Sequence, residues 1–329
     1  MFFLETLVVL RFDHIFIISL RMSEIYQTTI LEPISFSGIG LHSGKISNIK
    51  IYSANDNEGI IFKRIDLENN NLVEANFKNV TSAKLCTTLE NNHGVRVSTV
   101  EHLLAAFYIA GIDNALVEIN SEEVPIMDGS AKDFLDVFNK TQIKTLPSRK
   151  KYLKVTNKVE LKDGNKTISI EPNQKSLEVD FQLNYENKII GNQRNNIDFQ
   201  KDKLDDVSNS RTFCLFEDIE KIKKIGLAKG GSLENAVVVH ENKVLNEGGL
   251  RNKKEFVNHK ILDLVGDFLL SGYRILGKVK CYQGGHELTN KFLRKILDTN
   301  NQKENVNINK FKILEKINTK TSPKLAVNA

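Results

Sequence analysis

The chain has 329 residues, of which 40% are hydrophobic, so its length predicts about two domains with a sizeable core. The formal net charge of +5 comes largely from the end of the chain, where six lysines and only two glutamates follow Asp298. The body is nearly neutral and has no basic stripe interleaved with aromatic residues, which excludes a general nucleic-acid binder. Cys86, Cys214 and Cys281 are far apart, so neither a zinc knuckle nor a disulfide framework is expected, and a cytoplasmic location fits best.

The two ends of the chain differ from its body. Residues 1–22 are rich in apolar side chains, but charges such as Glu5 and Arg11 interrupt them, so we expect neither a membrane span nor a signal peptide. Because Met22 directly precedes the first recognisable pattern, translation beginning there is one alternative, and a peripheral membrane anchor is another. Residues 299–329 are rich in Asn and Lys and predict a disordered tail.

The first half of the body, residues 23–146, is predicted to be an α+β domain. Short β-like runs broken by Gly and Asn clusters are followed by a segment with apolar residues at a helical period. The predicted elements are strands within 25–80, a helix at 98–110, a strand at 114–120 and a second helix that ends at 138.

The second half, residues 147–298, repeats this plan without a close sequence repeat. A polar segment with a proline, 145–151, is predicted to be the linker between the halves. After it we expect strands at 153–161, 167–170, 177–183, 236–239 and 278–282, with helices at 216–225, 254–270 and 288–297. A site built between two such domains would lie at an interface, which is a common place for a catalytic pocket.

The helix predicted around residue 260 carries the strongest chemical signal. It places His259, Asp263 and Asp267 on one face at steps of four residues. An imidazole and a carboxylate at this spacing can bind one metal ion, although a solvated polar face is the alternative. Catalytic zinc usually has three protein ligands and a water, so a third ligand must come from elsewhere, and His102 is the best candidate.

Glu101 and His102 each have two interpretations. Ser98 to Glu101 reads as a capping box, in which the glutamate bonds back to the backbone of Ser98. The alternative is that Glu101 takes a proton from a metal-bound water as a general base. A helical histidine beside leucines is often merely packed, so His102 gains weight only together with His259 and Asp263.

Three further residues are weaker candidates. His286 follows two glycines, where it is either a proton donor or an ordinary surface histidine. Thr212 could donate its hydroxyl to a developing oxyanion or serve as a turn residue. Lys260 could neutralise an anionic substrate group or be solvated. Neither the HExxH zinc helix nor the GxxxxGK[ST] phosphate loop is present.

Taken together, these segments resemble the UDP-3-O-acyl-N-acetylglucosamine deacetylases, the zinc amidases of lipid A synthesis. The resemblance runs from about Tyr26 to Leu297, and its strength lies in several dispersed matches in the right order. The matching segments are 37–44 (SGIGLHSG), 98–103 (STVEHL), 125–130 (PIMDGS), 211–213 (RTF), 230–232 (GGS), 245–251 (LNEGGLR), 259–263 (HKILD) and 285–286 (GH).

The resemblance implies a role for each candidate. Zinc would be held by His102, His259 and Asp263, with the fourth position left for water. Glu101 would be the general base, Thr212 the oxyanion donor, His286 the cationic acid that protonates the departing amine, and Asp267 the carboxylate that orients it. The residues that match positions near the substrate are Lys260, beside the diphosphate, and Phe213, Cys86 and Gly231, near the pocket.

The resemblance also implies a fold, a reaction and partners. The fold would be two similar α+β domains whose helices pack between two outer sheets, with inserts bordering an apolar passage. We expect a monomeric enzyme that uses water to remove the N-acetyl group of UDP-3-O-acyl-N-acetylglucosamine, transiently close to the inner membrane. One rival is a zinc amidase for another acylated sugar. A second is a nucleotide-sugar binding protein with a structural zinc, which would need four protein ligands.

Overall fold

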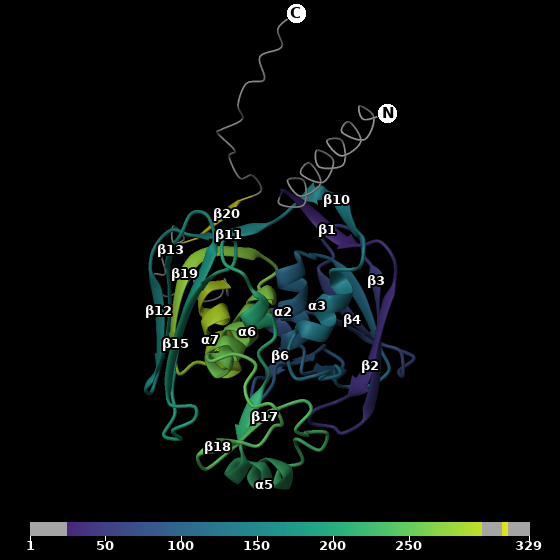
Figure 1. The fold of residues 1–329 in the computed structure, drawn as a ribbon. Helices are drawn as coiled ribbons and strands as arrows, with labels where there is room; N and C mark the ends of the chain where they lie inside the picture. The colour runs from purple at the N-terminus through teal and green to yellow at the C-terminus, as the bar shows by residue number, and fades with distance from the viewer. Residues whose placement is uncertain (1–24, 298–310, 315–329) are drawn as a thin grey trace, which may run out of the picture.

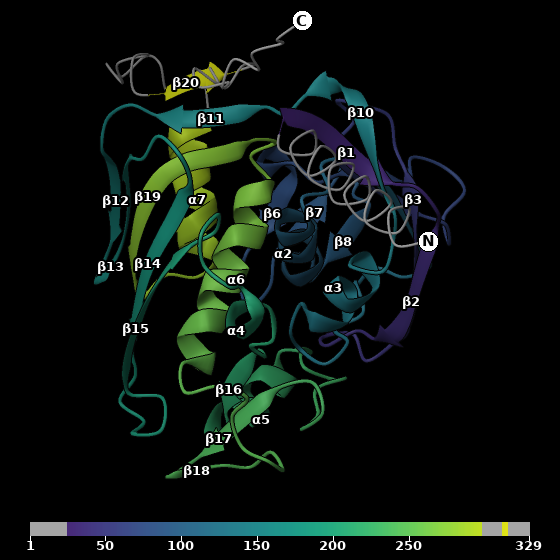
Figure 2. The same cartoon turned by 45° about the horizontal axis from the view of Figure 1, so that its top comes forward.

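The computed structural model describes residues 25–297 and 311–314. It is a mixed α+β structure in which the central helices lie between two outer β-sheets, as Figures 1 and 2 show. The fold class predicted from the sequence is therefore confirmed, whereas the domain limits stay predictions. The extension 1–22 and most of the tail 299–329 lie outside the described residues. No helix within 25–297 is long and apolar enough to cross a membrane.

The outer sheet of the first half has five strands, and burial alternates along them. In β3 every second side chain points into the core, which is typical of a sheet with one covered face. Helices α2 (Glu101–Ala110) and α3 (Lys132–Phe138) lie on that face (Figure 2). The strands, in sheet order, are β2 (Ile34–Ile39), β3 (Ile46–Ser53), β9 (Ala115–Ile119), β4 (Ile60–Arg64) and β5 (Leu72–Glu74).

Two smaller sheets complete the first half. One pairs β1 (Tyr26–Ile30) with β10 (Ile143–Arg149). The other contains β6 (Val80–Ser82), β7 (Thr88–Glu90) and β8 (Arg96–Ser98) and follows the 3-10 helix η1 (Phe77–Asn79). Because only two residues separate the end of β8 from the start of α2, this small sheet fixes where α2 starts.

The outer sheet of the second half has seven strands and covers α6 (Glu255–Leu269) and α7 (His286–Leu297) (Figure 1). Strand β19 is central and pairs in parallel with both β11 and β14. The short helix α4 (Asp205–Ser208) packs beside α6. The strands are β11 (Tyr152–Val155), β12 (Val159–Asp163), β13 (Lys166–Pro172), β14 (Leu177–Asn184), β15 (Asn192–Asp198), β19 (Arg274–Tyr282) and β20 (Phe311–Leu314).

A third unit projects from one end of the molecule, opposite strands β11 and β20 (Figure 1). It consists of β16 (Phe213–Leu215), α5 (Phe216–Lys224), β17 (Val237–His240) and β18 (Lys243–Val244). Helix α5 has no buried residue, although one of its faces is apolar. An apolar helical face that is not packed into a core is free to border a cavity.

The close contact between α2 and α6 holds the two halves together. Almost all of α6 is buried, from Glu255 to Phe268, and only Lys260 breaks the run. A Cβ atom at Gly266 would overlap the carbonyl of Glu101 and come within 3.1 Å of the backbone nitrogen of Ala105. Glycine at this position therefore lets the two helix backbones approach each other.

Two segments predicted to lack regular structure contain strands. The predicted linker 145–151 is mostly strand β10, which pairs antiparallel with β1 and buries Leu146. Main-chain pairing does not require apolar side chains, so the polar composition of this segment was misleading. Within the predicted disordered tail, Phe311–Leu314 forms β20 and pairs with β11.

Candidate active site

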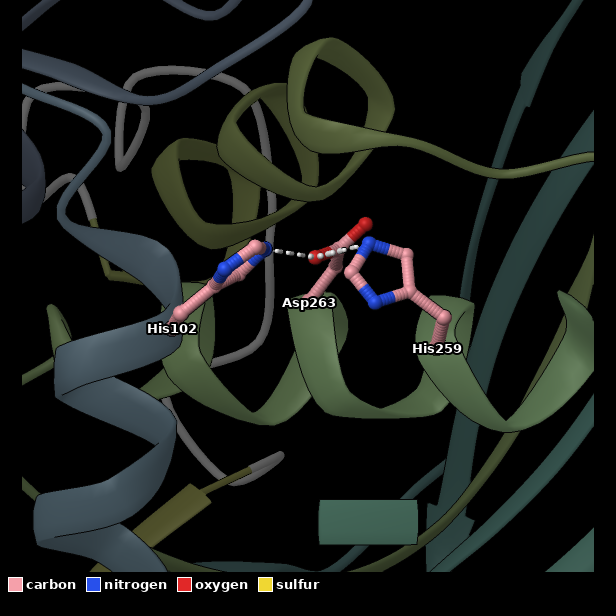
Figure 3. Close-up of side chains that lie close together, drawn as sticks. All are labelled: His102, His259 and Asp263. Atoms are coloured by element: carbon pink, nitrogen blue, oxygen red, sulfur yellow. Dashed lines mark ion pairs between the residues drawn. The ribbon is translucent and has the colours of Figure 1, made fainter. Parts of the chain in front are cut away.

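The three predicted metal ligands come together where α2 crosses α6. Nε2 of His102 lies 3.5 Å from Oδ1 of Asp263, and Nε2 of His259 lies 3.3 Å from the same oxygen (Figure 3). All three side chains are buried, and one ligand atom from each lies within 4.8 Å of the others. The two rings approach the carboxylate from different helices, so the arrangement exists only in the folded protein.

The hydrogen bonding and protonation of Asp263 and His259 suit a metal site. Among the described residues, Oδ1 of Asp263 has no hydrogen-bond partner, although both rings are near it. Nδ1 of His259 lies 3.1 Å from the carbonyl oxygen of Ser210 and can donate to it, which leaves the Nε2 lone pair free. Burial lowers the pKa of His259 to about 3, so its ring is neutral. Two imidazoles and one carboxylate suit zinc with an open position.

The Asp263 carboxylate is ionised. Although burial opposes ionisation, the neighbouring His259 ring and the positive charge of Lys260 hold the pKa of Asp263 well below its usual range. Nζ of Lys260 lies 2.8 Å from Oδ2 of Asp263 and 5.6 Å from the centre of the Phe213 ring. Lys260 is therefore paired with a candidate ligand and is not simply solvated.

Glu101 borders the triad, and the predicted capping box is wrong. Helix α2 begins at Glu101, and the N–H of Ser98 donates to the carbonyl of Glu122 instead. Oε2 of Glu101 accepts from the N–H of Thr87 at 3.0 Å, while Oε1 lies 3.7 Å from Nε2 of His286. Burial raises the pKa of Glu101, and the positive charge of His286 opposes this. A buried carboxylate with a raised pKa is suited to accepting a proton.

His286 is the first residue of α7 and only 7% exposed, so its interpretation as a surface histidine is wrong. Its Nδ1 lies 2.8 Å from Oδ2 of Asp267, whose other oxygen accepts from the hydroxyl of Thr87 at 2.7 Å. Although burial opposes protonation, Asp267 and Glu101 raise the pKa of His286 to about 10. The ring is therefore a cation at neutral pH.

An apolar cavity of about 340 Å³ lies between α5 and the loop after β2. Thr212, Phe213 and Gly231 lie on its wall, and the Phe213 ring also contacts the His259 ring, with centroids 6.2 Å apart. Its large aliphatic lining residues are Leu41, Leu85, Ile219, Ile222, Leu233 and Leu245. The cavity therefore reaches from the projecting unit to the side of the metal triad.

The predicted pocket residue Cys86 is placed differently. It is buried beside Thr88, 3.8 Å from the threonine hydroxyl, and is not on the wall of the apolar cavity. Burial raises the pKa of Cys86 to about 12, so its thiol stays protonated and unreactive. A larger groove of about 510 Å³ at the other end of α6 contains none of the predicted site residues.

Sequence reasoning missed four residues that support the site. Thr87 binds both Glu101 and Asp267, and the carbonyl of Ser210 orients His259. Glu123 and His42 hold the loop after β2 beside the triad. Their positions depend on contacts between distant segments, and His42 was visible only as part of a matching segment.

Comparison with known proteins agrees with this architecture. The LpxC family model, described as UDP-3-O-acyl N-acetylglycosamine deacetylase, matches residues 27–298. The deacetylase of Pseudoalteromonas translucida, named UDP-3-O-acyl-N-acetylglucosamine deacetylase, is 42% identical over 84% of this chain and 91% of its own length. The protein of the same name from Geotalea uraniireducens is 43% identical over 83% of this chain and 88% of its own length. This chain therefore belongs to the UDP-3-O-acyl N-acetylglycosamine deacetylase family.

Proposed function

We propose that this protein hydrolyses the N-acetyl group of UDP-3-O-acyl-N-acetylglucosamine to the free amine and acetate, a step of lipid A biosynthesis. The observation that carries the proposal is the convergence of His102, His259 and Asp263 with Glu101 and His286 in one buried centre. Amide hydrolysis needs an electrophile, a base and an acid close together, and this centre contains residues suited to each task.

The metal that suits the donor set is Zn²⁺, held by His102, His259 and Asp263. When bound, zinc would polarise the amide carbonyl and lower the pKa of a water molecule, so that this water gives up a proton readily and becomes a better nucleophile. Within the described part of the chain the metal-binding group has three members, whereas a structural zinc site is closed by four. The donor set therefore favours an enzyme over a binding protein with a structural zinc.

The two groups beside the triad would carry out the proton transfers. Glu101 takes the proton of the attacking water, because its carboxylate is buried and has a raised pKa. His286 starts as a cation and donates its Nε2 proton to the departing amine, while Asp267 holds the other ring nitrogen. Thr212 donates its hydroxyl to the oxyanion that forms on the carbonyl oxygen. An amide expels its amine readily only when the nitrogen is protonated.

The substrate would be held along the cavity wall. The apolar cavity under α5 suits the acyl chain, and Phe213 and Gly231, on the wall of this cavity, would contact the substrate. Lys260 would place a positive charge near the substrate's diphosphate, and Cys86 would lie near the substrate pocket without lining the apolar cavity. We further propose a cytoplasmic monomer that meets its lipid-like substrate transiently at the inner membrane.

The test is acetate release from UDP-3-O-acyl-N-acetylglucosamine by protein that begins at Met22. Turnover should disappear on chelation and return with zinc. If folded, zinc-loaded protein gives no acetate, the substrate assignment is wrong. The same assay with other acylated N-acetyl sugars then distinguishes an amidase of different specificity, which turns one of them over, from a binding protein, which turns over none.

A further inference from the structure

One buried hydrogen-bond donor beside the site has no partner in the mechanism above. His42 lies in the turn between β2 and β3, is 8% exposed, and lines the apolar cavity. Its Nδ1 accepts from the backbone N–H of Ala228 at 3.4 Å, so in the neutral ring the proton is on Nε2. Within residues 25–297 and 311–314, Nε2 has no hydrogen-bond partner. An unpaired buried N–H is costly, so it calls for a ligand.

The turn that carries His42 is held firmly by Glu123. This carboxylate is 1% exposed and accepts from the backbone N–H groups of His42 and Ser43, at 2.8 and 2.7 Å. It also accepts from the hydroxyl of Thr99 at 2.9 Å, two residues before α2 begins. A single buried carboxylate therefore fixes the position of the imidazole relative to the helix that carries Glu101 and His102.

His42 is also electrostatically close to the catalytic centre. Burial lowers the pKa of His42, the Glu123 carboxylate opposes this, and the nearby His102 and His286 lower the pKa further, so the ring stays neutral. The same ring borders the apolar cavity. It therefore lies at the junction between the metal triad and the cavity proposed for the acyl chain.

We infer that Nε2–H of His42 binds the carbonyl oxygen of the ester that joins the acyl chain to the sugar. This inference rests on the proposed function. In the substrate the acetamide and the acyl ester are on adjacent sugar carbons, so when the acetamide is at the triad and the chain is in the cavity, the ester lies between them. An ester carbonyl is only an acceptor, which complements a neutral ring with one donor. His42 would thus be a specificity residue for the acylated sugar.

The test compares the ester substrate with a 3-O-alkyl ether analogue of equal chain length, which lacks the carbonyl oxygen. In the wild type, kcat/KM should be about tenfold higher for the ester, the value of one ordinary hydrogen bond. His42→Met should remove this preference, because its side chain cannot donate. His42→Gln should retain part of it, because the amide nitrogen can take the place of Nε2.

The inference would be overturned if His42→Met lowered kcat/KM equally for the ester and the ether. It would also be overturned if the wild type had the same kcat/KM for both compounds. A second readout does not need turnover. Calorimetry with the metal-free protein and the two deacetylated compounds should show the same preference in Kd, and its loss in His42→Met. If the wild type releases no acetate from either compound, the proposed function is wrong. The difference in Kd between the two deacetylated compounds then still decides whether His42 binds the ester carbonyl.

Discussion

Glu101 and His286 are neighbours that must start the reaction in opposite states, the glutamate without a proton and the histidine with one. Each is held by a second residue. The backbone of Thr87 supports the glutamate, and Asp267 supports the histidine. Because both ring and carboxyl group are buried, neither can exchange its proton freely with bulk water. The chemistry at this scale therefore depends on which of the two groups carries a proton when substrate binds.

Glu101→Gln separates the chemical role of this residue from its structural one. The amide keeps the shape and can still accept from the N–H of Thr87, but it cannot take a proton from water. We expect kcat to fall by about 10²–10⁴-fold while zinc content and the denaturation midpoint stay at wild-type values. Acetate release, metal analysis and urea unfolding check this, and full activity in the variant would exclude Glu101 as the base.

Asp267→Asn should change the pH dependence of the reaction. The Asp267 carboxylate is the main group that raises the pKa of His286 to about 10, while burial lowers it. Without that charge the pKa of His286 falls, so the ring loses its proton at lower pH. The alkaline limb of the profile of kcat/KM against pH should therefore move to lower pH. An unchanged alkaline limb would show that another group is the acid.

At the scale of the secondary-structure elements, the site depends on how closely α2 approaches α6. Gly266→Ala would place a methyl group against the backbone of Glu101, which cannot move away as a flexible side chain could. We expect a loss of about 1–3 kcal/mol in the free energy of unfolding and weaker zinc binding, because the helices separate. Urea unfolding and zinc titration measure the two effects. Wild-type values in both would mean that the helices adjust at no cost.

The helices were largely predictable, and several strands were not. Apolar periodicity identified α2 and α6, because apolar residues recur along both helices at a helical spacing. Strand β15 escaped prediction, since its sequence is polar and it is held by main-chain pairing with β14. The start of α2 was misplaced for a similar reason, because Ser98 belongs to β8 and Thr99 has a positive φ of 55°.

At the scale of the whole molecule, a buried ionic cluster joins the two halves at the far end of α2. Asp113 accepts from the backbone N–H of Thr28 at 2.9 Å, and its carboxylate lies 2.6 Å from Nζ of Lys150 and 3.2 Å from the guanidinium of Arg274. Arg274 also stacks over the Tyr108 ring at 4.5 Å. The cluster thus connects β1, α2 and the residue that follows β10 with β19.

Arg274→Met should weaken the whole fold, because it leaves a mostly buried carboxylate with one cation fewer. We expect a loss of about 3–5 kcal/mol in the free energy of unfolding, as for a broken buried pair. The matched control is Lys291→Met, which removes exposed pairs with Asp163 and Glu287 and should cost less than about 1 kcal/mol. Equal losses in the two variants would show that the cluster does not join the halves.

The metal triad was predictable only as a combination. His259 and Asp263 share a helix face, but His102 is far away in the sequence, and nothing local predicts that the two helices meet. Thr87 and Ser210 were invisible for the same reason, since a backbone N–H or carbonyl has no signature in the amino-acid pattern, and the Thr87 hydroxyl meets Asp267 only through a contact between distant segments. What the sequence supplies is the chemistry of the side chains, and the tertiary contacts decide which of them meet.

The distribution of ligands between α2 and α6 has a consequence for biosynthesis. His102 is made long before His259 and Asp263, so a nascent chain has no three-ligand site until α6 has emerged from the ribosome. Tight capture of zinc would then be one of the last events in maturation and would depend on docking of the two halves. The same dependence applies during proteolysis. Zinc would be released as soon as α2 and α6 separate, even if most of the chain is still uncleaved.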